Sequence, residues 1–183
     1  MNTAIVTGGS GDIGRACAEA LMVDGYRVGI LDLASDKLTQ VAEDIGATAL
    51  GADVTDEPDV ERALAEFGAV PDVVVNNAGI GRFASLLDMP IETFRLQLDV
   101  NLVGSFIVAR AAARGMVVRG SGRILNVTSI NAITTGPGTG SYPASKAGLA
   151  KMTEMMALEW GCFEYAKGLL HNWLSYYLIV SRC

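Results

Sequence analysis

The segments Asn2-Thr-Ala-Ile-Val-Thr7 and Gly8-Gly-Ser-Gly-Asp-Ile-Gly14 decide the fold of this chain. The first is a short apolar run with β-branched residues, which predicts a buried strand, and the second is a glycine-rich turn. Helical periodicity begins directly afterwards, in Arg15-Ala-Cys-Ala-Glu-Ala-Leu21. A strand, a glycine turn and a helix in this order present backbone N–H groups to a phosphate, with no Cβ in the way. A glycine loop by itself is a weak signal.

Four further apolar runs are separated by stretches with helical periodicity. The runs are Tyr26–Leu31, Ala47–Leu50, Asp72–Val75 and Arg123–Val127. We expect helices to begin near Ala34 and at Thr55-Asp-Glu-Pro58, and to cover Ile91 to about Val118 and Tyr142 to Trp160. Strands that alternate with helices predict an α/β fold, with a doubly wound, mostly parallel, Rossmann-like sheet and helices on both faces.

The composition is consistent with one such domain. Hydrophobic residues make up 50% of the 183 residues and charged ones 19%, which suits a sheet that is buried on both faces. The net charge of −6 argues against nucleic acid or an anionic membrane as a partner. The first strand is predicted from residue 2, and no uninterrupted apolar run approaches the ~20 residues of a membrane span, so we expect a cytoplasmic protein without a signal peptide.

Residues that commonly bind metals are few. Cys17, Cys162 and Cys183 are widely spaced and form no ligand pattern, so we expect free thiols and no metal site. His171 is the only histidine. No Ser/His/Asp triad can be arranged around it, and we interpret it as a surface or packing residue.

Asp32 follows the strand Tyr26–Leu31, eighteen residues after Gly14. This is close to the ~20 residues expected of an acid that binds the ribose hydroxyls of a dinucleotide. A carboxylate there repels a 2′-phosphate, so NAD is favoured over NADP, although Arg15 could assist a 2′-phosphate. The alternative is that Asp32 only ends a strand or caps the helix that we expect near Ala34.

A serine, a tyrosine and a lysine lie where proton transfer would need them. Ser129 follows the fifth predicted strand, and Pro143 suits the first turn of a helix that starts at Tyr142. Tyr142 and Lys146 are four residues apart, so they share one face of that helix. A free phenol has a pKa of about 10, and a nearby ammonium group favours the ionised form. The alternative is an ordinary helix start, because Tyr-x-x-x-Lys is common by chance.

Two further polar features are candidates for a nucleotide site. Asn76-Asn-Ala-Gly79 follows a strand and has small residues that allow a ligand to approach, although asparagines after strands are usually turn formers. Asn101 lies on the apolar face of the helix from Ile91, where a buried amide needs partners. Backbone groups alone could satisfy it.

Taken together, these motifs resemble the short-chain dehydrogenase/reductase family. The matching elements are Thr7-Gly8-x-x-x-Asp12-x-Gly14, Asn76-Asn77-Ala78-Gly79, Asn101, Ser129 and Tyr142-x-x-x-Lys146, in the family's order and with its spacing. The resemblance covers residues 1–161, which we interpret as one dinucleotide-binding and catalytic domain. The family usually has glycine at the position of Asp12, and we expect Gly11 to accommodate the turn instead.

The resemblance implies an oxidoreductase that transfers a hydride between NAD(H) and a small secondary alcohol or ketone. Tyr142 would be the acid/base, assisted by Lys146, while Ser129 would hold the substrate oxygen and Asn101 a proton-relaying water. The cofactor contacts that it implies are Gly8, Ser10, Gly11, Asp12, Ile13, Gly14, Asp32, Asp53, Val54, Asn76, Ala78, Gly79, Tyr142 and Lys146, with Asp53 near the adenine. It also implies a homo-oligomer, formed through the helices at 91–118 and 142–160.

The resemblance ends at Gly161, and residues 162–183 form an atypical tail. Members of the family continue with two strands, a nicotinamide-binding turn and a substrate lid. We therefore expect a C-terminally incomplete fold that lacks the segments that shape the substrate pocket. Tyr176–Val180 has strand propensity and could cover the open edge at Arg123–Val127, while a helix over Tyr165–Leu174 is the competing prediction. A second hypothesis is therefore a truncated module that binds dinucleotide or a partner without turnover. For these 183 residues we expect low or absent activity, weakened cofactor affinity and poor solubility.

Overall fold

A computed structural model describes residues 1–161 in full and the backbone of residues 164–169 and 176–181. Five parallel strands form one sheet in the order β3-β2-β1-β4-β5. They are β1 (Thr3–Thr7), β2 (Arg27–Asp32), β3 (Thr48–Gly51), β4 (Val73–Asn76) and β5 (Arg123–Asn126). Each lies within one residue of its predicted run at both ends, and the predicted parallel sheet is confirmed.

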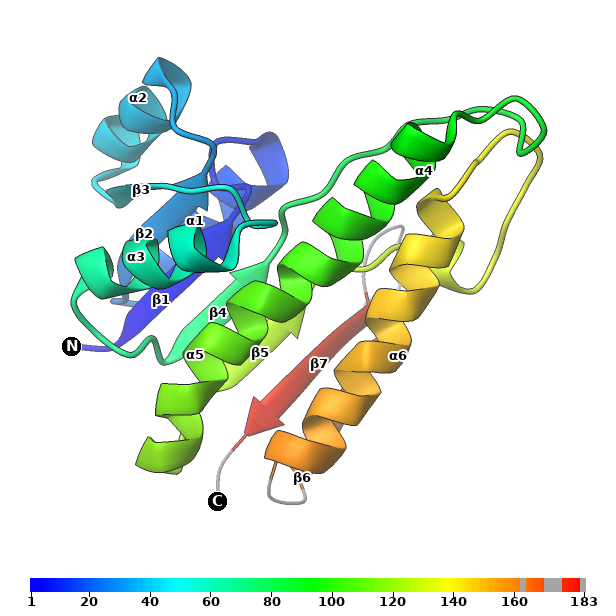
Figure 1. The fold of residues 1–183 in the computed structure, drawn as a ribbon. Coiled ribbons are helices and arrows are strands. Elements are labelled where there is room, and N and C mark those ends of the chain that lie inside the picture. The colour runs from blue at the N-terminus through cyan, green and yellow to red at the C-terminus, as the bar shows by residue number, and fades with distance from the viewer. Residues whose placement is uncertain (162–163, 170–175, 182–183) are drawn as a thin grey trace.

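Helices cover both faces of the sheet (Figure 1). α1 (Asp12–Val23) and α2 (Asp36–Ile45) pack on the face that carries Ala4 and Val6 of β1. α3 (Glu57–Phe67), α5 (Ser105–Arg119) and α6 (Tyr142–Trp160) pack on the other face, which carries Ile5. Side chains alternate between faces along a strand, and both sides of β1 are fully buried, as a central strand requires.

The long helical pattern after Ile91 is one rod made of three parts. α4 (Ile91–Leu98) continues through a π-helical segment, η1 (Asp99–Gly104), into α5. We predicted a single regular helix from Ile91, and the structure differs from that prediction by the π-helical turn around Asn101. Such turns are rare and frequently mark functional sites.

The rod Ile91–Arg119 also meets the length and composition of a membrane span. Its mean hydropathy reaches 1.3 over 18 residues, although polar residues interrupt its apolar runs. Half of that window is buried inside the protein, and the core helix of a soluble protein passes the same test.

The helices after β2 and β3 begin at side-chain caps. Ser35 caps α2 by accepting a hydrogen bond from the Leu38 amide. Asp56 caps α3 in the same way, as the acidic start signal indicated. The alternative that Asp32 caps the helix expected near Ala34 is therefore wrong, since α2 begins at Asp36 and Ser35 is its cap.

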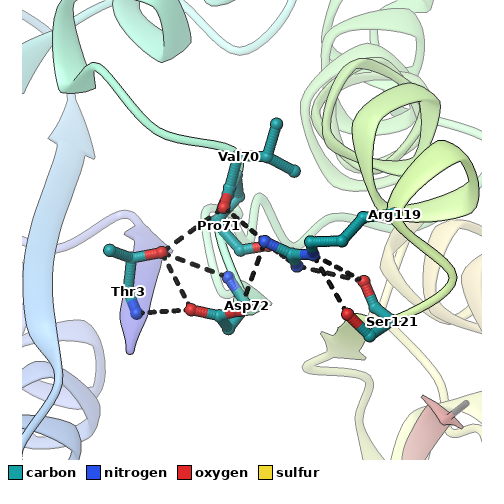
Figure 2. Close-up of polar contacts among 6 residues, drawn as sticks. All are labelled: Thr3, Val70, Pro71, Asp72, Arg119 and Ser121. Atoms are coloured by element: carbon teal, nitrogen blue, oxygen red, sulfur yellow. Dashed lines mark hydrogen bonds and ion pairs between the residues drawn. The ribbon is translucent and has the colours of Figure 1, made fainter. Parts of the chain in front are cut away.

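A polar cluster closes the edge of the sheet where β1, β4 and β5 begin (Figure 2). Asp72 accepts hydrogen bonds from the backbone amide of Thr3 at 2.7 Å and from its hydroxyl at 3.1 Å. Arg119, at the end of α5, forms an ion pair with Asp72 at 3.2 Å. Its guanidinium also donates to the carbonyls of Val70, Pro71 and Ser121. The cluster joins the helix layer to the bases of three strands.

The tail contains two further strands, β6 (Glu164–Leu169) and β7 (Tyr176–Ser181), which pair with each other in antiparallel fashion. The helix predicted from Tyr165 is wrong over β6. The strand predicted at Tyr176–Val180 is present, and it lies beside β5 (Figure 1), yet the five-stranded sheet ends at β5 and β7 belongs to a separate pair.

Three of the residues considered for metal binding lie outside the described part of the chain. These are Cys162, His171 and Cys183. Cys17 on α1 is a free thiol, as predicted, and burial raises its pKa.

Candidate active site

The glycine turn after β1 is closely packed around the backbone. Gly8 has a left-handed φ of +63° and donates its N–H to the carbonyl of Leu31 in β2. A Cβ on Gly14 would lie 2.2 Å from the Gly8 carbonyl oxygen, so only glycine fits there. Gly11 has a φ of −85°, and our expectation that it accommodates the turn is wrong, because Gly8 does so. Asp12 is exposed in the first turn of α1.

Asp32 braces this turn from the end of β2. Its Oδ2 accepts hydrogen bonds from the hydroxyl of Ser10 at 2.5 Å and from the amide of Ser10 at 3.1 Å. Its Oδ1 accepts from the amide of Leu33 at 2.9 Å. The carboxylate is half-buried, and it lies at the edge of the neighbouring cavity.

A cavity of about 320 Å³ opens beside the turn, at the carboxyl ends of β1 to β4. Its size and largely apolar lining are those of a small-molecule site. Six of the predicted cofactor contacts line it, together with residues from the loop after β4 and from the rod. The lining is Gly8, Asp32, Leu33, Ala52, Asp53, Val54, Thr55, Ala78, Gly79, Ile80, Arg82, Leu96 and Val100.

Two of the lining residues also hold the cavity wall together. Oδ1 of Asp53 accepts from the amide of Thr55 at 2.9 Å and from its hydroxyl at 2.8 Å. Val54 is buried against the rod, where a Cβ on Gly104 would lie 2.8 Å from its Cγ2. The small residue in the π-helical segment thus lets the loop after β3 pack on the rod.

Tyr142 and Lys146 share one face of α6, as predicted. The Lys146 ammonium nitrogen lies 5.9 Å from the centre of the Tyr142 ring. Lys146 is only 4% exposed, and its Nζ donates to the carbonyl of Val127 at 2.8 Å. Burial lowers its pKa to about 8, because desolvation penalises the charged form. At neutral pH the lysine still carries its charge in most molecules.

Asn101 is buried and joins two segments. Its Oδ1 accepts from the amide of Ile80 at 2.7 Å, and its Nδ2 donates to the carbonyl of Ile80 at 2.9 Å. Nδ2 also donates to the hydroxyl of Ser145 on α6 at 3.0 Å. Ser145 in turn donates to the carbonyl of Tyr142 at 2.8 Å. The prediction that a buried amide at this position needs partners is confirmed.

The cavity and the catalytic candidates meet at Gly79. A Cβ on Gly79 would lie 3.1 Å from Oδ1 of Asn101 and 3.4 Å from Nζ of Lys146. A side chain at position 79 would thus crowd Asn101 and Lys146, and glycine avoids this contact. Gly79 therefore both lines the cavity and lies beside Asn101 and Lys146.

Ser129 and Asn76 are both buried near this junction. Ser129 accepts from the amide of Asn131 at 3.2 Å and so caps a short 3₁₀ turn, η2 (Ile130–Ala132), that packs against α6. The amide of Asn76 donates to the carbonyl of Ser105 and to Oδ1 of Asn126. Its side chain thus bonds α5 and β5, and the lining of the cavity does not include Asn76.

Four residues at this site were not identified from the sequence. Gln97, Ser141 and Ser145 are buried in hydrogen bonds, and the ring of Phe83 lies edge-on to that of Tyr142 at 5.8 Å between centres. One signal was available for Gln97, because it stands four residues before Asn101 on the same helix face.

The chain is Rossmann-like by its sheet order, its glycine turn and its cavity at the ends of the parallel strands. A sequence model of the short chain dehydrogenase family matches residues 2–164, and the chain belongs to this family. Its relatives are oxidoreductases.

Three relatives illustrate the likeness. An NAD-dependent glycerol dehydrogenase from Listeria innocua is 34% identical over 86% of this chain and 64% of that enzyme. An L-rhamnose 1-dehydrogenase (NAD(P)(+)) from Azotobacter vinelandii is 40% identical over 87% of this chain and 67% of that enzyme. The crystal structure of a 3-oxoacyl-[acyl-carrier protein] reductase with bound NAD from Brucella melitensis has a TM-score of 0.83 at 32% identity, covering 86% of this chain and 65% of that one. The chain spans about two thirds of the length of these relatives.

Proposed function

We propose that this chain carries the NAD(H) site and the proton-transfer residues of an oxidoreductase that interconverts a secondary alcohol and a ketone. The observation that carries the proposal is the position of Gly79, which lines the same cavity as Asp32 and lies beside Asn101 and Lys146. The family membership supports it.

The residues present fit a dinucleotide. The turn at Gly8 and Gly14 leaves no space for side chains, and no side chain caps the first turn of α1, so backbone N–H groups remain for a phosphate. Asp32 stands where ribose hydroxyls can donate to it, and its charge favours NAD over NADP. The L-rhamnose 1-dehydrogenase relative is named for both cofactors, so the preference needs its own measurement.

The proposed chemistry assigns one task to each side chain. When bound, the nicotinamide ring accepts or gives the hydride. Tyr142 takes the proton from the alcohol oxygen during oxidation and returns it during reduction, and the ammonium group of Lys146 assists at 5.9 Å from the centre of its ring. Ser129 donates a hydrogen bond to the same oxygen. Asn101 holds Ile80 and Ser145 in place, and the second lone pair of its Oδ1 can accept a hydrogen bond from a water that relays the proton.

The direct test compares turnover with cofactor binding in the same preparation. NADH formation is measured with a panel of secondary alcohols, beside an NADH titration followed by fluorescence. Tyr142→Phe should abolish nearly all turnover and leave NADH affinity within a few fold, because the phenol oxygen serves the proton transfer and not the nucleotide. Substantial turnover in that variant would refute the assignment.

A second candidate is a module that binds dinucleotide without turnover. The observation that favours it is the end of the family match at residue 164, with about two thirds of the relatives' length covered. NADH binding with no turnover across the alcohol panel selects this candidate, whereas turnover above about 1 s⁻¹, an ordinary enzyme rate, excludes it.

We also propose a homo-oligomer formed through the helices at 91–118 and 142–160. Large apolar side chains are exposed on both, with Val103 at 43%, Met155 at 53% and Leu158 at 80%. Light scattering behind size exclusion tests this. Leu158→Glu should dissociate the assembly, and a monomeric mass for the unmodified chain would contradict it.

A further inference from the structure

Gln97 on α4 is an uncharged polar side chain with no exposed surface. Its Oε1 accepts a hydrogen bond from the amide of Arg82, and its Nε2 donates to the hydroxyl of Ser141. Both ends of the amide are therefore used, one on the loop after β4 and the other at the start of α6. Since a buried amide is costly without partners, these two bonds hold the three segments together.

The arrangement repeats one turn further along the rod. Asn101, four residues later, bonds Ile80 in the same loop and Ser145 on the same helix, and Ser145 is four residues after Ser141. Gln97 and Asn101 thus form two parallel bridges between the loop and α6. Asn101 belongs to the motifs that resemble the family, whereas Gln97 belongs to no motif identified in the sequence.

The two partners of Gln97 immediately precede two rings that touch. Arg82 is followed by Phe83, and Ser141 by Tyr142, and these rings meet edge-on. Phe83 is 66% exposed, so burial alone does not fix its position. Ser141 is 1% exposed and makes no side-chain cap to its own helix, and its hydroxyl is instead bonded to Gln97.

We propose that Gln97 is a positioning residue for Tyr142, acting through Ser141 on the backbone before the tyrosine and through Arg82 on the ring of Phe83 that packs against it. The inference rests on the proposed function for its catalytic consequence. The role of Gln97 in the position of Tyr142 does not depend on the proposed function, since the hydrogen bonds to Arg82 and Ser141 are present whatever reaction the site performs.

The test replaces the amide without changing the length of the side chain. Gln97→Met leaves the Arg82 amide and the Ser141 hydroxyl without their partner. Ser141→Ala removes a single oxygen and with it only the hydrogen bond between Gln97 and residue 141. Gln40→Met is the matched control, because Gln40 is an exposed glutamine on α2 whose amide bonds only Asp44 in the same helix.

The first readout is independent of activity. The ring signals of ¹³C-labelled tyrosine are recorded by NMR, with Tyr142→Phe to assign Tyr142 and Phe83→Ala to show its signal without the neighbouring ring. Gln97→Met and Ser141→Ala should both move the Tyr142 signal toward its position in Phe83→Ala, and Gln40→Met should leave it unchanged. In the double variant, Gln97→Met with Ser141→Ala, the signal should move no further than in Gln97→Met alone. The reason is that Gln97→Met already breaks the hydrogen bond that Ser141→Ala removes.

The second readout is kinetic. In Gln97→Met, kcat should fall about 10- to 100-fold, as expected when a reacting group is slightly misplaced, while the dissociation constant of NADH changes less than about threefold. If the unmodified chain shows no turnover, the proposed function fails and the NMR result still decides the role of Gln97. An unmoved Tyr142 signal in Gln97→Met and in Ser141→Ala, with only a lower melting temperature, would overturn the inference. Should Gln97→Met not fold, Ser141→Ala carries the same decision.

Discussion

Replacing Lys146 with methionine should change how the stability of the fold depends on pH. The ammonium group is buried, and its pKa falls from the ordinary value of 10.5 to about 8. At about 1.4 kcal/mol for each tenfold change in proton affinity, the charged lysine costs the folded state about 3 kcal/mol. Methionine removes that cost, and it also removes the hydrogen bond to the carbonyl of Val127. The informative quantity is therefore how the difference in the free energy of unfolding between Lys146→Met and the unmodified protein changes with pH.

The sign follows from the protons bound in each state. Below pH 8 the lysine is charged in both the folded and the unfolded chain, and the folded state bears the full cost. Between pH 8 and 10.5 the folded lysine is neutral while the unfolded one remains charged, so the unfolded state binds more protons and stability rises with pH. Lys146→Met lacks this rise. Its stability relative to the unmodified protein should fall by about 2.5 kcal/mol between pH 7 and pH 10.

Urea unfolding of both proteins, followed by circular dichroism at pH 7, 8, 9 and 10, measures this difference. Other groups that titrate over the range affect both proteins equally and cancel. Lys37→Met, at an exposed position on α2, is the control and should show a difference that is constant with pH. A difference for Lys146→Met that stays within about 0.5 kcal/mol across the range would refute the burial argument.

Two further substitutions test the cofactor preference and the base of the sheet. NADH should bind more tightly than NADPH, and Asp32→Ala should reduce the difference between their binding free energies by about 1–3 kcal/mol, the size of a hydrogen bond to a charged group. Fluorescence titration measures both dissociation constants. Equal values in the unmodified protein would contradict the assignment of Asp32. Arg119→Met removes the ion pair to Asp72 and three backbone contacts of the cluster in Figure 2, and it should lower the free energy of unfolding by about 1–2 kcal/mol in urea, whereas Arg123→Met at an exposed position should cost less than about 0.5 kcal/mol.

The strands could be predicted within one residue because each is a short apolar run that turn residues interrupt. Val73, Val74 and Val75 are all buried, and a run that is apolar on both faces has few alternatives to a central parallel strand. The Tyr142 helix was equally clear, since Pro143 marks its first turn. Local patterns were sufficient wherever local sequence determines the backbone.

The remaining features depend on contacts that no local pattern records. The π-helical turn at Asn101 has the same apolar spacing as a regular helix, so the sequence predicted one continuous α-helix. Gln97 looks like a surface residue until the loop at Arg82 and the start of α6 are placed on either side of it. The turn at Gly8 likewise depends on its contact with β2, which made Gly11 the wrong choice.

The site combines one buried charge with a neutral framework. Among the described residues, Lys146 is the only buried one with a charged side chain. Its charge destabilises the folded state because burial removes the ammonium group from water. The groups that hold the loop after β4 against α6 are the amides of Gln97 and Asn101, which do not titrate. The framework therefore keeps its bonds while Lys146 loses its proton near pH 8. Any change in cofactor affinity or turnover between pH 7 and 9 that Lys146→Met abolishes should thus reflect the loss of one charge and not a rearrangement of the site.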